Sequence, residues 1–173
     1  MALLPLRVSC GFDWVDKTVD INVILLVSTS DTISFQTTLR VRDTCLCLHL
    51  QRAARLVARR FDDALQPVGL TNGQFSLLMS LNQPDPPTIG GIATLLAMDR
   101  TTVTANLKPL ERRGLVKIRL NAADRRTRLL VLTSKGRSVL RKALPIWERE
   151  HGEVESELSC SPNELRRFLQ LRK

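Results

Sequence analysis

Helical periodicity organises the chain from about residue 44 onward. Apolar residues recur at three- and four-residue steps as far as Leu65, with arginines largely on the opposite side, which predicts an amphipathic helix. This helix ends before Pro67, because the residue preceding a proline is disfavoured in the helical region. Its apolar positions are Leu46, Leu50, Ala53, Ala54, Val57, Phe61 and Leu65.

Three more helices are predicted before residue 115. The run from Thr71 to Gln74 has the composition of a capping box and begins the second helix. Thr88 caps a short third helix over residues 89–97. The fourth helix is capped by Asp99 and ends at Gly114.

After residue 114 the pattern changes to the twofold alternation of a β-strand. Apolar and basic residues alternate over 116–120, and Leu130 and Leu132 alternate on a return strand, with a polar turn between them. A long helix then begins at Thr133-Ser134, and a short helix closes the chain. The predicted fold class is mostly α, with a helix-turn-helix pair followed by a two-stranded β-wing.

Positive charge is concentrated in this middle region. The chain carries 26 Lys and Arg against 17 Asp and Glu, and residues 100–142 hold 13 basic groups against only Glu111 and Asp124. Such an excess favours a polyanionic partner, most often nucleic acid. No run approaches the ~20 apolar residues of a membrane span, so we expect a cytoplasmic protein with no membrane partner.

The helix over residues 100–113 is the one that can enter a DNA major groove, braced by the helix before it. If Val103, Leu107 and Leu110 face inward, small residues near its start face base edges and cations farther along reach phosphates. Its predicted DNA-binding residues are Arg100, Thr101, Thr102, Thr104, Ala105, Lys108 and Arg112.

The wing supplies a second predicted set of contacts. An arginine at a hairpin tip, held by a neighbouring carboxylate such as Asp124, suits the narrow and negative minor groove of A·T-rich DNA. The alternative is an exposed ion pair worth ~0–1 kcal/mol, but the tip has little apolar surface to pack. The predicted contacts are Arg119, Arg125, Arg126 and Arg128.

Five stretches of the chain carry a family resemblance. The most specific is Met98–Val116, which reads MDRTTVTANLKPLERRGLV. The others are Cys45–Arg55, Leu70–Phe75, Asp124–Arg126 and Leu132–Arg137. In this order, across residues 44–172, they resemble the multiple-antibiotic-resistance regulator (MarR) family of bacterial transcription factors.

The resemblance implies a winged helix-turn-helix homodimer on a palindromic double-stranded DNA operator. The winged-helix core would cover about residues 70–133, with dimerisation helices at about 44–66 and 134–172, and Asp124 would orient Arg126 into the minor groove. The preferred interpretation is a repressor released by a small-molecule or oxidative signal. The family's usual effectors, small aromatic or phenolic anions, would lie between the winged and dimer regions, and no cofactor is expected.

Cys45 and Cys47 raise a redox alternative. In the family branch that senses organic hydroperoxides, a reactive cysteine lies near the start of the first helix, where Cys47 matches it. That branch uses tyrosine hydroxyls to hold the thiolate, whereas this chain has no tyrosine, and Phe61 and Phe75 stand in the expected places. A thiol without a stabilising donor reacts slowly. We therefore favour two small apolar residues at a dimer seam, with redox sensing through Cys47 as the alternative.

Other function classes find less support. The sequence has no nucleophile elbow, phosphate-binding glycine loop or metal-ligand spacing, so we expect no enzyme. A non-specific basic nucleic-acid-binding protein stays open, although binding to single strands needs exposed aromatic residues. Beyond residue 43 the aromatic residues all have core-like spacing: Phe61, Phe75, Trp147 and Phe168.

Residues 1–43 lie outside the resemblance. They carry four basic and five acidic groups, and they are rich in Val, Ile, Thr and Ser. One hypothesis is an upstream extension from a misassigned start, with Leu39 or Val41 as an alternative start position. The other is a weak β-hairpin in which Ile24–Val27 pairs with Ile33–Val41, which alone would be marginal in water.

Overall fold

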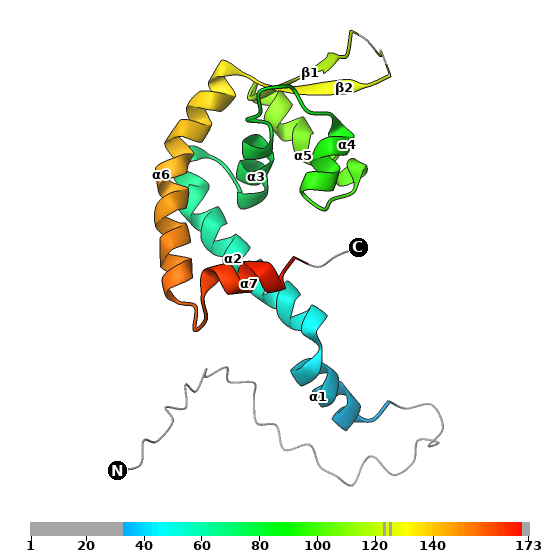
Figure 1. The fold of residues 1–173 in the computed structure, drawn as a ribbon, viewed down its shortest axis with the longest axis vertical. Helices are drawn as coiled ribbons and strands as arrows, with labels where there is room; N and C mark the ends of the chain where they lie inside the picture. Colours follow the sequence, from blue (N-terminus) through cyan, green and yellow to red (C-terminus); the bar gives the residue numbers. More distant parts are fainter. Residues whose placement is uncertain (1–32, 123, 125, 171–173) are drawn as a thin grey trace. The chain divides into compact units, whose positions relative to one another are not determined.

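The computed structural model describes residues 33–122, 124 and 126–170, which divide between two units, Met1–Cys45 and Leu46–Lys173. The described part of the first unit contains the helix α1, Phe35–Thr44. The second holds α2 (Leu46–Leu65), α3 (Asn72–Ser80), α4 (Ile89–Leu95), α5 (Arg100–Arg112), β1 (Val116–Leu120), β2 (Arg128–Leu132), α6 (Ser134–Ser156) and α7 (Pro162–Phe168) (Figure 1).

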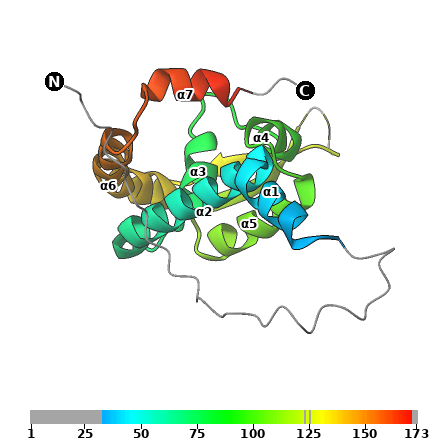
Figure 2. The same ribbon diagram turned by 90° about the horizontal axis from the view of Figure 1, so that it is seen from below.

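The predicted mostly helical fold with a two-stranded antiparallel wing is confirmed. The pairing of β1 with β2 places Val116 opposite Leu132 and Leu120 opposite Arg128. Figure 1 shows this hairpin extending beyond the helices, and Figure 2 shows α7 at the periphery, following the end of α6. Leu120, predicted to lie on a half-buried strand, is 63% exposed because it is near the tip of the wing.

The helix ends follow most of the sequence signals. Thr71 and Gln74 form the predicted capping box, in which the Gln74 amide donates to Thr71 Oγ1 and the Thr71 amide donates to Gln74 Oε1. Gly114 ends α5 with φ of +70°, a conformation that glycine adopts at little cost. Asp99 occupies the predicted N-cap position of α5, but its side chain makes no capping hydrogen bond.

One core joins the end of α2 to α3, α4, α5, the wing and α6. The apolar stripe of α5 contributes Val103, Leu107 and Leu110, all at most 1% exposed. Burial of large aliphatic side chains at this level stabilises the fold by about 1.5–3 kcal/mol each. Leu65 of α2 and Leu130 of β2 complete the centre of the same cluster.

The start of α2 does not join this core. Of its predicted apolar positions only Phe61 and Leu65 are buried, whereas Leu46 is 67% exposed. Phe168, predicted to be a core residue, is also wrongly assigned, because it is 79% exposed on α7. The first and last helices of the second unit, α2 and α7, therefore each expose an apolar side chain to solvent.

Arg60 ties α2 to α6. Its Nε donates to Glu150 Oε1 at 2.8 Å, and its Nη1 donates to Glu157 Oε2 at 2.6 Å. These hydrogen bonds raise the pKa of Arg60, and the bond to Glu157 has the larger effect. Glu150 is only 9% exposed, and an unpaired carboxylate at such a position would be costly. Arg60 provides the opposite charge.

The predicted β-hairpin for the N-terminal segment is wrong where the structure describes it. Residues 35–44 form α1, and the Ser34 hydroxyl caps it by accepting from the Thr37 amide. The cap satisfies a helix amide locally, whereas Ile33–Val41 as a strand would need a sheet partner. Ile24–Val27, the proposed partner strand, lies outside the described residues.

Gly136, in the first turn of α6, has no room for a side chain. A Cβ at this position would collide with the carbonyl oxygen of Leu115 and lie 2.8 Å from Leu132 Cδ1. We expect Gly136→Ala to lower the free energy of unfolding by about 1–3 kcal/mol, as for other overpacked sites. Urea denaturation followed by circular dichroism measures the change.

Gly152 of the same helix provides the matched control, since a Cβ there meets nothing within 4 Å. We expect Gly152→Ala to leave stability unchanged or raise it by up to about 1 kcal/mol, because alanine favours the helix. Equal stabilities for the two variants would contradict the packing described at Gly136.

Candidate nucleic-acid interface

The α4–α5 pair is set by a cap, a tight turn and the buried face of α5. Thr88 Oγ1 accepts from the Gly91 amide at 3.0 Å and begins α4. Between the helices Ala97 has φ of +51°, and the Met98 amide donates to the Ala93 carbonyl at 2.8 Å. The turn thus fixes the start of α5 against α4, as in helix-turn-helix motifs.

Most side chains predicted to face outward from α5 do so. Thr101, Thr102, Ala105, Lys108 and Arg112 are exposed. Thr104 is half-buried, and its hydroxyl donates to the Arg100 carbonyl at 2.8 Å. The exposed face therefore has small residues near the N-terminus of the helix and cations farther along.

The wing is anchored to the start of α4. The Leu130 amide donates to the Pro87 carbonyl at 2.9 Å, and Thr88 forms a β-bridge with Leu129. Because these bonds join the wing to the same residue that caps α4, the position of the wing is tied to the α4–α5 pair. Arg119 and Arg128 are exposed on the wing strands.

Asp124 stabilises the wing turn through hydrogen bonds to its own neighbours. Its Oδ2 accepts from the Thr127 hydroxyl at 2.6 Å, and its Oδ1 accepts from the Arg126 amide at 3.0 Å. These hydrogen bonds lower the pKa of Asp124, and the bond from Thr127 has the larger effect. The carboxylate thus stabilises the turn and contacts Arg126 through its main-chain amide. Arg125 lies outside the described residues.

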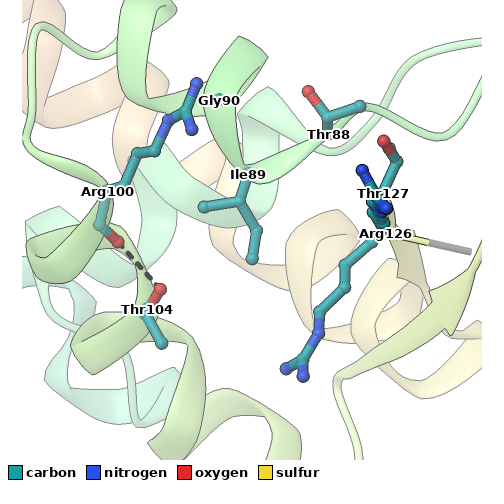
Figure 3. A pocket seen from close by; sticks show the side chains of 8 residues that line it. Thr88, Ile89, Gly90, Arg100, Thr104, Arg126 and Thr127 are labelled. Atoms are coloured by element: carbon teal, nitrogen blue, oxygen red, sulfur yellow. Dashed lines mark hydrogen bonds between the residues drawn. The ribbon is translucent and has the colours of Figure 1, made fainter.

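A cavity of about 400 Å³ lies where α4, α5 and the wing meet (Figure 3). Of the residues that the structure describes, none that lines it is acidic. Arg100 and Thr104 come from α5, and Arg126 and Arg128 come from the wing. The sequence interpretation missed the remaining lining residues: Thr88, Ile89, Gly90 and Thr127.

Apart from the basic cavity, the structure has an apolar groove between α3 and α6. Phe75 and Trp147 stack with ring centroids 6.1 Å apart, and they line a pocket of about 250 Å³. A neighbouring pocket of about 230 Å³ shares Met79 and Leu144 and is lined by Arg137 and Arg141. Trp147, predicted to be core, packs against the core and also forms a wall of this groove.

The cysteines lie at the junction of α1 and α2. Cys45 is half-buried at the C-cap of α1. Cys47 is exposed in the first turn of α2, and the Gln51 Nε2 donates to its Sγ at 3.2 Å. Phe61 and Phe75, expected in place of tyrosine donors, are buried.

The described residues contain neither a cluster suited to a metal ion nor a membrane-spanning helix. Among residues 33–122, 124 and 126–170, no group of three His, Cys, Asp or Glu side chains could hold a metal ion. No helix in that same part of the chain has the length and apolar character required to cross a membrane.

Comparison with known proteins gives a consistent result. A family model described as MarR family matches residues 70–127. The chain is 36% identical over 86 residues to YwoH, an uncharacterized HTH-type transcriptional regulator of Bacillus subtilis, and the match covers 50% of this chain and 62% of YwoH. It is also 36% identical over 104 residues to the transcriptional regulator HosA of Escherichia coli O127:H6, covering 59% and 74% of the two chains.

A solved structure supports the same relationship. The M. tuberculosis transcriptional regulator MosR in complex with DNA has a TM-score of 0.66 and 38% sequence identity. The match covers 72% of this chain and 90% of that one.

The lowered pKa of Asp124 has a measurable consequence. Its hydrogen bonds favour the ionised carboxylate, so they are present above the ordinary carboxyl pKa and are lost as pH falls through the lower, folded-state value. In an NMR titration we expect the Arg126 amide proton to shift with a midpoint below about 3.9, the ordinary value for Asp. Asp124→Asn, which cannot ionise, serves as the control and should abolish that titration step. A midpoint at or above the ordinary value would contradict the described turn.

Proposed function

Because this chain belongs to the MarR family of transcriptional regulators, we propose that it binds a palindromic operator as a homodimer and represses transcription until a chemical signal releases it. The observation that carries the proposal is the joining of α5, α4 and the wing around one basic cavity. In this arrangement α5 can enter the major groove, and the wing beside it carries arginines and is anchored to α4.

The chemistry of the two elements suits the two DNA grooves. Thr101 and Ala105 are small enough to bring α5 close to base edges, and a threonine methyl suits the methyl of thymine. Lys108 and Arg112 can reach phosphates, which position a protein on DNA without reading sequence. Arg126 at the wing turn suits the negative potential of a narrow minor groove.

The exposed apolar surface supports a homodimer. Leu46 on α2 and Phe168 on α7 are 67% and 79% exposed, in helices that flank the winged region in sequence. We propose that a second copy covers them, through the helices at about 44–66 and 134–172. Two-fold symmetry would then place the paired α5 helices in half-sites about one DNA turn, roughly 34–36 Å, apart.

The experiment measures binding to duplex DNA fragments that the protein itself selects from a random pool. We expect a selected palindromic duplex to bind far more tightly than random duplex or the separated single strands. Equal affinity for all duplexes would favour the non-specific alternative, and a preference for single strands would overturn the proposal.

Arg126→Ala should weaken this binding, because it removes a cation positioned beside the DNA backbone. We expect the slope of log affinity against log salt to fall by about one. Arg126→Lys is the matched control, since it keeps the charge and should keep the slope. A slope unchanged in Arg126→Ala would show that the wing arginine does not neutralise a phosphate.

The releasing signal that the structure favours is a small aromatic anion. The groove between α3 and α6 offers Trp147 and Phe75 for a ring, and Arg137 and Arg141 line its neighbouring pocket, where they can meet a carboxylate. A ligand there would contact α3, which packs on α4 and on α5, the helix that carries most of the predicted DNA-binding residues.

Oxidation is the second candidate signal, favoured by the exposed thiol of Cys47. A hydroperoxide would oxidise this thiol to a sulfenic acid and leave as an alcohol. The Cys45 thiol would then attack that sulfur, forming a disulfide and releasing water.

One set of titrations separates the two signals. We expect 4-hydroxybenzoate to quench Trp147 fluorescence and to release the selected duplex, and Trp147→Phe to lose the quenching. Release by cumene hydroperoxide that Cys47→Ser abolishes, with no response to the aromatic anion, would assign the signal to the thiol instead.

A further inference from the structure

Arg100 is folded back over α4. A Cβ added to Gly90 would lie 3.1 Å from Nη2 of Arg100 and 3.5 Å from both its Cζ and its Nε. The guanidinium therefore lies directly over the bare backbone of Gly90, as Figure 3 shows. Without a side chain at position 90, the cation of α5 can rest against the neighbouring helix.

This placement puts Arg100 on the wall of the basic cavity. Arg126 and Arg128 of the wing line the same cavity, as does Thr88. Figure 3 shows Arg100 on one side of it and Thr88 and Arg126 on the other. Among the described residues no carboxylate lines the cavity, so the guanidinium groups of Arg100, Arg126 and Arg128 meet no counter-charge from that lining. Like charges gathered around a small space repel one another, and an anion in that space would relieve the repulsion.

The donors of the cavity match a phosphate group. Guanidinium groups offer N–H donors in a fork that fits phosphate oxygens. Thr88 Oγ1 accepts from the Gly91 amide, which leaves its own hydrogen to donate. A phosphodiester passing between α5 and the wing would meet donors from both elements at once.

We propose that this cavity is a site for a phosphodiester of the DNA backbone, and that Gly90 is the positioning residue that holds Arg100 in it. The inference rests on the proposed function and deepens it. Arg100 is thereby assigned to the backbone rather than to base edges, and the specificity for sequence is left to the residues farther along α5.

A double-mutant cycle on the selected duplex tests the proposal. Gly90→Leu should displace the guanidinium, and Arg100→Ala should remove it. Each is expected to weaken binding roughly tenfold, as for loss of one charge-assisted contact, and to lower the salt slope by about one. The double variant should bind no more weakly than Arg100→Ala alone.

Gly73→Leu is the matched control. This glycine is exposed on α3, and a Cβ there would meet nothing within 4 Å. We expect the affinity of Gly73→Leu to equal that of the unmodified chain. Additive losses for Gly90→Leu and Arg100→Ala, or a Gly90→Leu variant that binds like Gly73→Leu, would overturn the proposal.

Phosphate ethylation interference tests the site without altering Gly90, and so it applies even if Gly90→Leu fails to fold. Ethylation removes the charge of single phosphates along the duplex. We expect at least one phosphate in each half-site whose ethylation weakens binding of the unmodified chain but not of Arg100→Ala. Identical interference patterns would overturn the inference while leaving the proposed function intact, whereas failure of the unmodified chain to bind any duplex would overturn the proposed function itself.

Discussion

The buried stripe of α5 is the constraint on which the interface depends. Val103, Leu107 and Leu110 lie in the core, so the helix can present only its opposite face. A helical rotation of one residue would bring Thr104 or Lys108 into that core and expose a leucine. The core therefore sets which residues meet a partner, and the hydrogen bonds of Pro87 and Thr88 to the wing extend the same constraint to the arginines of the hairpin.

Electrostatics explains why this surface suits a polyanion. Arg100, Arg126 and Arg128 line the cavity, and the part of the lining that the structure describes holds no acidic side chain. Such a cluster contributes nothing favourable to the folded chain alone, since the cations repel one another. The one carboxylate near the wing tip that the structure describes, Asp124, uses its oxygens on Thr127 and on the Arg126 amide. Positive charge is thus left for a partner, while the turn that carries it is held by main-chain bonds.

Sequence reasoning succeeded where a pattern is local. The 3.6-residue period identified the buried face of α5, and the change to alternation located the wing, because both follow from the geometry of one element. The same reasoning missed Thr88 and Gly90, which reach the cavity only through the packing of α4 against α5 and β2. The single signal for Thr88 was its N-cap position, and none marked Gly90.

The wrong assignments at residues 33–41 and at Phe168 have physical causes as well. The abundance of Val, Ile, Thr and Ser in the N-terminal segment suggested a strand over 33–41, but the Ser34 cap favours the helix α1. Phe168 has the spacing of a core residue, yet α7 leaves it exposed, as an apolar face does when its cover is another molecule. Periodicity reveals which residues share a face, but it does not say whether the same chain covers it.

If α5 and the wing meet DNA together as one surface, both should be protected by it. Hydrogen-exchange mass spectrometry of the chain with and without its selected duplex measures this protection. We expect slower exchange at the start of α5 and in the wing turn, with little change along the outer face of α6. Protection confined to α6, or to α5 without the wing, would contradict it.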